Sequence, residues 1–230
     1  EEARDIVASC FNCKNSEIYF TSCGTESDNW AIKGVCAFNK NKGKHIITSN
    51  IEHHAVLDTF LYMKKQGYEI TVVPVEKNGI IDPLKIEKEI RKDTILISVM
   101  FANNEIGTIQ PIAEIGSIVR KNNIIFHTDA VQAAGTIPID VKEMNIDLMS
   151  ISAHKFYGPK GVGALYIRRG IMIDNLFHGG GQERTRRAAT ENISGIVGLA
   201  EALKLSLENM DYNNNHIKKI RDAVKRGIEQ

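Results

Sequence analysis

Short apolar runs rich in β-branched residues alternate with longer amphipathic runs along this chain, and that alternation most constrains its fold. The short runs predict seven strands, at residues 18–21, 45–48, 70–75, 95–101, 124–128, 148–152 and 162–167. Helical patterns separate the first six, including those at residues 26–38, 55–65, 84–91 and 112–121. Strands joined through helices usually run parallel. The sequence therefore predicts an α/β fold with a mostly parallel sheet covered by helices on both faces.

Length and composition favour a single folded unit. The chain has 230 residues, of which 43% are hydrophobic and 25% charged, and no Ser-, Gly- or Pro-rich linker divides it. We expect one domain over residues 1–230. After residue 190 the pattern predicts an apolar helix from 193, a polar break at 211–215 and a charged helix over 217–230. Both ends fall within helical patterns, so we expect a fragment of a longer protein.

The charge balance indicates which partners to expect. Lys and Arg number 29 against 28 Asp and Glu, so the net charge of +1 gives no field that would attract nucleic acid or a membrane surface. The apolar runs are far shorter than the roughly 20 residues that cross a bilayer. The acidic amino terminus has no signal-peptide pattern. We expect a cytoplasmic protein that binds neither nucleic acid nor membrane.

All four cysteines lie in the first sixth of the chain. Cys10 and Cys13 form a C-x-x-C pair, which suggests redox chemistry or half of a zinc site. No second pair follows at zinc-finger spacing. We therefore predict reduced, structural thiols and no bound metal.

Residues 150–163 leave an apolar strand and place Ser152, His154 and Lys155 at its end. A lysine in a partly desolvated pocket has a lowered pKa and can attack an aldehyde to form a Schiff base. The alternative is a solvated lysine beside a glycine-rich turn. The position of Lys155 between a buried strand and Gly158-Pro159 favours the chemical interpretation.

Asp129 follows another apolar strand, again at its carboxyl end. A carboxylate there can keep a pyridine nitrogen protonated, which makes the ring an electron sink, and Gln132 could reach a ring substituent. A lone aspartate at this point is more often a helix N-cap. The interpretation therefore depends on its neighbours.

Three further turns carry candidate ligands. The turn at residues 21–29 presents the amides of Gly24 and Thr25 at a helix start, which suits a phosphate, although the same residues also suit a simple cap. Residues 101–107 offer Asn104 as a hydrogen-bonding amide or merely a turn residue. His53 opens a helix where its ring could stack on a planar cofactor. Neighbouring His54 points elsewhere on a helix, so paired metal ligation is not expected.

Taken together, these segments closely resemble the cysteine desulfurases, a group of class V aminotransferases. The matching segments are residues 22–27, 52–56, 103–107, 129–132 and 152–155, and 178–184 with 186–192. Their order and spacing match along almost the whole chain. Residues 103–107 and 179–184 resemble the group that serves iron–sulfur cluster assembly. The resemblance implies the large domain of the aspartate-aminotransferase-type fold and the cofactor pyridoxal 5′-phosphate (PLP).

The resemblance also implies roles for single residues. Lys155 would form the Schiff base with PLP, His53 would stack on the ring and assist proton transfer, and Asp129 would pair with the pyridine nitrogen. Asn104 and Gln132 would contact the ring oxygen. The phosphate would be held by Gly24, Thr25, Ser152, His154 and, from the second subunit of a homodimer, Thr190.

The implied reaction converts L-cysteine to L-alanine and leaves sulfur as an enzyme persulfide for an iron–sulfur scaffold or another acceptor protein. Relatives carry the attacking cysteine on a carboxyl-terminal domain, and no cysteine follows Cys36 here. We therefore expect residues from about 206 to 230 to start a linker helix, and this chain alone not to sustain turnover. Related aminotransferases, selenocysteine lyases and an inactive scaffold-binding module remain alternatives.

Two positions depart from the family pattern. Cys23 stands where relatives usually carry a small residue, and Ala189 replaces the glycine that commonly precedes the threonine. A Cβ at residue 189 would restrict the backbone if its φ is positive. The predicted role of Thr190 therefore depends on the backbone conformation at Ala189.

Overall fold

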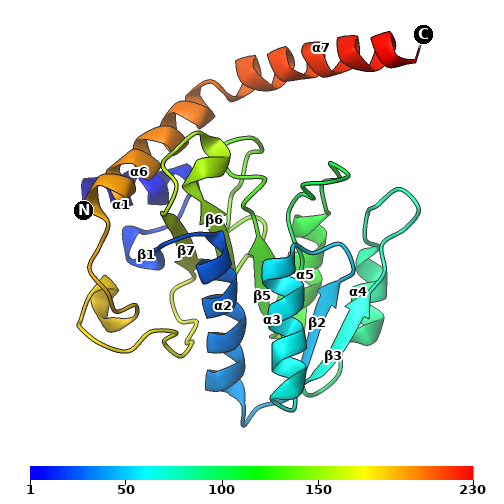
Figure 1. The fold of residues 1–230 in the computed structure, drawn as a ribbon. Coiled ribbons are helices and arrows are strands. Elements are labelled where there is room, and N and C mark those ends of the chain that lie inside the picture. The colour runs from blue at the N-terminus through cyan, green and yellow to red at the C-terminus, as the bar shows by residue number, and fades with distance from the viewer. Residues whose placement is uncertain (230) are drawn as a thin grey trace.

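A seven-stranded sheet with helices on both faces forms the body of the molecule in a computed structural model that describes residues 1–229 (Figure 1). The strands are β1 (Ile18–Thr21), β2 (His45–Ser49), β3 (Glu69–Val73), β4 (Thr94–Ser98), β5 (Ile125–Asp129), β6 (Leu148–Ser152) and β7 (Gly163–Ile167). Their order across the sheet is β1-β7-β6-β5-β4-β2-β3. The fold class predicted from the alternating pattern is confirmed.

The strand directions bring one end of most strands to a common edge. β6, β5, β4, β2 and β3 run parallel, and β7 pairs antiparallel with both β6 and β1. β1 therefore points the same way as β6. Every residue of β2, β4, β6 and β7 is buried, which explains their continuous apolar sequences. The edge strand β3 is only partly buried.

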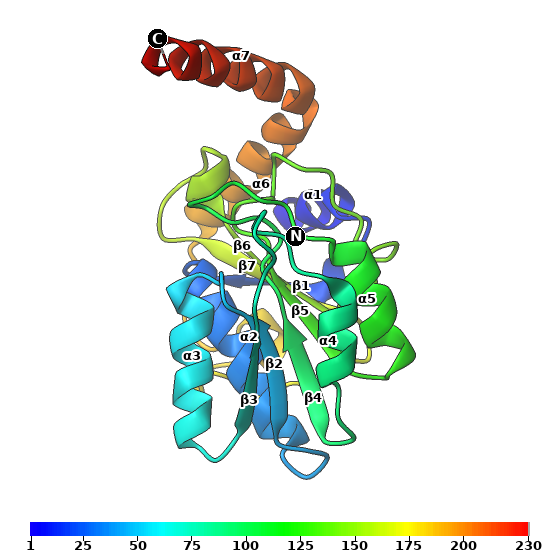
Figure 2. The ribbon, with the colours of Figure 1, turned by 90° about the vertical axis from the view of Figure 1, so that its right-hand side faces the viewer.

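Helices cover the two faces of the sheet in two groups (Figure 2). One face carries α2 (Gly24–Asn39) and α3 (His54–Lys65), which pack on a core that includes Trp30 and Phe60. The other face carries α1 (Glu2–Cys10), α4 (Pro83–Glu89), α5 (Ile112–Lys121) and α6 (Ile193–Glu208). Three short 3-10 turns complete the fold, η1 (Asn15–Glu17), η2 (Ala153–Phe156) and η3 (Glu183–Thr185).

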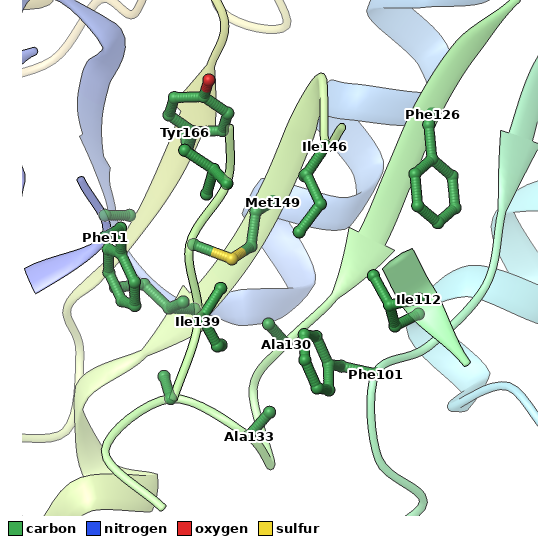
Figure 3. Close-up of a cluster of buried hydrophobic side chains, with 14 of the residues drawn as sticks. Phe11, Phe101, Ile112, Phe126, Ala130, Ala133, Ile139, Ile146, Met149 and Tyr166 are labelled. Carbon is green, nitrogen blue, oxygen red and sulfur yellow. The ribbon is translucent and has the colours of Figure 1, made fainter. Parts of the chain in front are cut away.

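The larger core joins parts of the chain that are distant in sequence. Phe11, which follows α1, lies in the same buried cluster as Phe101, Phe126 and Met149 (Figure 3). Burying a side chain of this size contributes about 2–3 kcal/mol. This cluster fixes the strands whose carboxyl ends build the candidate site.

Two expectations about the helices need correction. The connection between β5 and β6 contains turns rather than an α-helix. The polar residues 211–215 do not interrupt a helix, because they lie inside α7 (Met210–Ile228). The break between α6 and α7 lies earlier, at Asn209. Asn214 donates its side-chain amide to the Thr136 carbonyl at 2.9 Å, a tertiary contact that sequence propensity does not include. Gln230, the last residue of the expected helix, lies outside the described residues.

Candidate active site

A cavity of about 250 Å³ opens at the edge where the parallel strands end. Nine of the ten predicted site residues line it, and these are Gly24, Thr25, His53, Asn104, Asp129, Gln132, Ser152, His154 and Lys155. Cys23, Asp28, Met100 and Val131 complete the lining. The tenth predicted residue, Thr190, does not line this cavity.

Five strands each deliver a part of the lining. Gly24 follows β1, His53 follows β2, Asn104 follows β4, Asp129 ends β5 and Ser152 ends β6. In open α/β sheets, ligands bind beyond the carboxyl ends of the strands. The topology therefore brings together residues that are distant in the chain, such as Gly24 and Lys155, which are 131 positions apart.

Gly24 permits a close approach at the amino terminus of α2. A Cβ at this position would lie 2.6 Å from Val131 Cγ2 and 3.4 Å from Ser152 Cβ. Its absence lets the first turn of α2 lie against the ends of β5 and β6. The first amides of a helix have no intrahelical partner and carry partial positive charge, so this end of the cavity suits an anion.

Ser152 and His154 lie at the same end of the cavity as this turn. The Ser152 hydroxyl and His154 Nδ1 are 3.0 Å apart, within hydrogen-bonding distance. Burial, and then the charges of Lys155 and Lys160, lower the pKa of His154. The ring is therefore neutral at neutral pH and can exchange a hydrogen bond with Ser152 or with a ligand.

Asp28 and Asp129 are buried in the cavity lining, and Glu52 is buried behind Met100, whose amide donates to it. We call these three acids the floor. Burial raises the pKa of each, and for Glu52 the value reaches about 8. Asp129 Oδ1 accepts a hydrogen bond from the Val131 amide at 2.9 Å. Asp28 Oδ1 has no hydrogen-bond partner among residues 1–229. The floor therefore carries acidic groups that the chain itself leaves partly unsatisfied.

His127 lies beside this floor and does not neutralise it. Its Nε2 is 3.5 Å from Asp28 Oδ1 and 3.0 Å from the Ser150 hydroxyl, and its Nδ1 is 2.8 Å from the Ser98 hydroxyl. Complete burial lowers the pKa of His127 to about 3, so the ring is uncharged at neutral pH.

Lys155 and His53 lie on the exposed rim. Lys155 is carried by η2 and forms no ion pair within residues 1–229. Burial raises the pKa of Asp129, and the Val131 amide and the nearby His53 and Lys155 side chains act in the opposite direction. His53 caps α3 by accepting the Ala55 amide on Nδ1 at 3.1 Å, which leaves Nε2 protonated in the neutral ring.

The two adjacent asparagines of residues 103–104 have different surroundings. Asn103 holds its own turn, because its side chain accepts the amides of Glu105 and Ile106 and donates to the Ile51 carbonyl. Asn104 makes no such contact and lines the cavity, as does Gln132. The structure thus places Asn104, rather than its neighbour, where a ligand could be reached.

Thr190 lies on the segment 176–192, which we call the strap. Thr190 lines a separate cavity of about 170 Å³ together with Ser22, Arg187 and Asn192. Ala189 has a φ of +103°, a conformation that favours glycine, so the restriction considered from the sequence is present. Within this chain the strap does not bring Thr190 to the other nine residues.

Sequence reasoning missed the buried acids Asp28, Glu52 and Glu26. Asp28 lies one helical turn after Gly24, and that spacing was the one signal that could have identified it.

The four cysteines are all free. Burial raises the pKa of Cys10, and it raises those of Cys13 and Cys36 to about 12.

The family model for class-V aminotransferases matches residues 1–230, and the chain belongs to this family. Among curated relatives, the cysteine desulfurase IscS of Methanosarcina thermophila is 59% identical over 98% of this chain. The cysteine desulfurase IscS of Clostridium botulinum is 57% identical over 99% of it. The chain spans 56% and 57% of the lengths of these two relatives.

Solved structures agree with this assignment. A NifS-like protein has a TM-score of 0.96 and 44% identity, and the match covers 99% of this chain and 63% of that protein. A structure described as SspA in complex with cysteine has a TM-score of 0.85 and 43% identity, covering 88% of this chain and 59% of that one. No helix within residues 1–229 is long and apolar enough to span a membrane.

Members of this family use PLP, and the residues present fit that cofactor. Buried carboxyl groups without a cationic partner suit a protonated pyridine nitrogen. The space left by the missing Cβ of Gly24, beside free helix amides, suits a phosphate. Within residues 1–229, no group of three or more His, Cys, Asp or Glu side chains could hold a metal ion.

Proposed function

We propose that the protein is a PLP-dependent cysteine desulfurase, which removes sulfur from L-cysteine and leaves L-alanine. The observation that carries the proposal is that one cavity contains both Lys155 and the buried acid Asp129. Supporting it, two curated relatives of at least 57% identity are named cysteine desulfurases, and one similar structure is described as a complex with cysteine.

The side chains divide the work according to their positions. When bound, PLP withdraws electrons from the α-carbon of an attached amino acid. Asp129 supplies negative charge at the floor, where it favours a protonated ring nitrogen over a neutral one. His53 moves a proton at the rim through Nε2, while Nδ1 stays bonded to the backbone. Lys155 provides the amine that holds the cofactor.

The remaining cavity residues orient the cofactor. Asn104 and Gln132 are the amide donors for the ring oxygen. The phosphate is bound by the amides of Gly24 and Thr25, the Ser152 hydroxyl and the His154 ring. Thr190 joins this set from the second subunit of a homodimer, a proposal supported by its position outside the cavity of its own chain.

The sulfur-accepting thiolate is not one of the four cysteines in this chain. Thiols with a pKa raised to about 12, as for Cys13 and Cys36, are almost wholly protonated at neutral pH, and burial acts on Cys10 in the same direction. Cys23 precedes α2, at the end of the cavity that suits the phosphate rather than the amino acid. We propose that sulfur passes through another thiolate to an iron–sulfur scaffold, in the cytoplasm.

The test loads the protein with PLP and adds L-cysteine, with D-cysteine as the control. We expect visible absorbance after loading and a spectral change with the L-isomer only, without catalytic release of alanine by residues 1–230 alone. Protein that acquires no visible absorbance would instead be a structural module. Sustained alanine release that disappears in Cys23→Ser would show that Cys23 is the nucleophile.

A further inference from the structure

Two ion pairs with side chains at most 12% exposed fasten the strap to the body of the molecule. Arg4 donates two hydrogen bonds of 2.8 Å to Glu183, and Arg187 donates bonds of 2.7 and 2.9 Å to Glu26. The two pairs differ in where the carboxylate lies. Glu183 is on the strap itself, whereas Glu26 is in the first turn of α2, two residues after Gly24.

Glu26 also determines the shape of the turn that precedes α2. Its Oε2 accepts the Ser22 amide at 2.8 Å and the Ser22 hydroxyl at 2.5 Å. These bonds hold residue 22 against residue 26 while the chain reverses through Cys23 and Gly24. Gly24 and Thr25 line the cavity at the start of α2, where the amides have no intrahelical partner.

The Glu26 carboxylate is unfavourable for phosphate binding when it is charged and unpaired. Burial alone would raise the pKa of Glu26, but hydrogen bonds from Arg187 and Ser22 lower it, so the group is ionised at neutral pH. An ionised carboxylate within two residues of Gly24 repels a bound phosphate. The Arg187 guanidinium, 5.4 Å from the Phe177 ring centroid, offsets that charge by bonding to both carboxylate oxygens of Glu26.

We propose that Glu26 and Arg187 are positioning residues for phosphate recognition. Glu26 shapes the turn at Gly24 and Thr25, and Arg187 neutralises the charge of Glu26. The inference rests on the proposed binding of PLP. Neither residue lines the cavity, so their effect is carried by the turn. The pair acts on the phosphate end alone and leaves the ring end unchanged.

The test compares two aldehydes that differ only in the phosphate, PLP and pyridoxal, in equilibrium titrations followed by absorbance. For Arg187→Met we expect PLP affinity to fall about tenfold or more, since a buried carboxylate is left without its partner beside the anion. Pyridoxal affinity should change less than about threefold. The double variant Glu26→Gln/Arg187→Met removes both charges and should recover most of the PLP affinity.

Controls separate this effect from a general loss of structure. Arg4→Met removes the other strap ion pair and should leave the ratio of PLP to pyridoxal affinity unchanged. Arg187→Lys keeps the charge but loses the fork of donors, so its ratio should lie between those of wild type and Arg187→Met. Far-UV circular dichroism of each variant confirms the fold.

The outcomes are distinguishable. Equal losses for PLP and pyridoxal in Arg187→Met would show a merely structural role and overturn the inference, as would a double variant no better than the single one. If Arg187→Met does not fold, Arg187→Lys and Glu26→Gln/Arg187→Met decide by the same ratio. Wild-type protein that binds neither aldehyde would refute the proposed function, and the inference with it.

Discussion

Two groups of buried acids, one at the cavity floor and one at the strap, have opposite electrostatic surroundings. At the cavity floor, no Lys or Arg within residues 1–229 pairs with Asp28, Glu52 or Asp129, and burial raises the pKa of each. Where the strap meets the body, Glu183 on the strap and Glu26 in α2 each form an ion pair with an arginine. The acids at the strap are thus paired with arginines of this chain, whereas the acids at the floor have no such partner and are complementary to a bound cation.

This difference separates a binding region from a structural one. A buried carboxyl group without a cationic partner tends to keep its proton, and a bound cation reverses that preference. A buried carboxylate already paired with arginine gains nothing from a ligand, and removal of its partner destabilises the fold. Changes at the floor should therefore alter chemistry, and changes at the strap should alter stability or geometry.

The largest expected effect is on reaction chemistry and follows substitution of Asp129 at the floor. Asp129→Asn should still capture PLP, because Lys155 is unchanged, but the amide cannot offset a pyridinium charge. We expect the exchange of the α-hydrogen of alanine with solvent to slow about a hundredfold or more, as when one preorganised charge contact is removed. Exchange measured by NMR in deuterated buffer checks this. The exposed control Asp211→Asn should exchange as wild type, and equal rates in Asp129→Asn would refute the assigned role.

The pH dependence of stability should distinguish the two regions next. Folded Glu52 holds its proton up to about pH 8, whereas the unfolded chain releases it near 4.5. Between these values the folded state binds more protons, so this residue lowers the free energy of unfolding as pH rises, by up to about 1.4 kcal/mol per unit. Glu52→Gln cannot bind this proton, so it should lack this residue's contribution to the fall in the free energy of unfolding with pH.

Urea denaturation at pH 5, 6, 7 and 8 measures this effect. The stability of Glu52→Gln relative to wild type should grow with pH and become constant above about pH 8. Glu26, whose pKa is lowered, should behave oppositely, since its contribution is present above its unfolded pKa and is lost as pH falls through the folded value. Parallel pH curves for wild type and Glu52→Gln would contradict the assignment of a proton to the floor.

The smallest expected effect lies in the strap backbone. Ala189→Gly should raise the free energy of unfolding by about 1 kcal/mol, because relief of a positive φ outweighs the added flexibility of the unfolded chain. Chemical denaturation measures it, and PLP binding should be unaffected. Ala188→Gly, which changes the neighbour without that conformation, should be destabilising instead. Destabilisation by Ala189→Gly would show that the strap bears no strain there.

The cavity could be predicted from the sequence because each contributing turn follows a recognisable strand. Asp129 and Ser152 end apolar strands, and Gly24 and His53 follow them, so the sheet alone gathers the lining. Roles beyond position came from the resemblance to a family. The sequence favoured Asn104 over Asn103 as the ligand without a physical reason, and the turn contacts of Asn103 supply that reason.

What could not be predicted depends on contacts between distant residues or on irregular backbone. Glu26 and Arg187 are 161 positions apart, and nothing in either local sequence indicates their pairing. Burial of Asp28 inside a polar first turn likewise requires the packed structure. Helix α7 passes through residues 211–215 despite their low helical propensity.

Covalent trapping shows whether this cavity holds PLP on Lys155. The protein is incubated with PLP, reduced with borohydride, and analysed by intact mass and peptide mapping, alongside Lys155→Ala and the neighbouring exposed control Lys160→Ala. We expect one added pyridoxyl group per chain, located at Lys155, retained in Lys160→Ala and lost in Lys155→Ala with the fold intact. A stoichiometric adduct at another lysine, or one that persists in Lys155→Ala, would contradict this expectation.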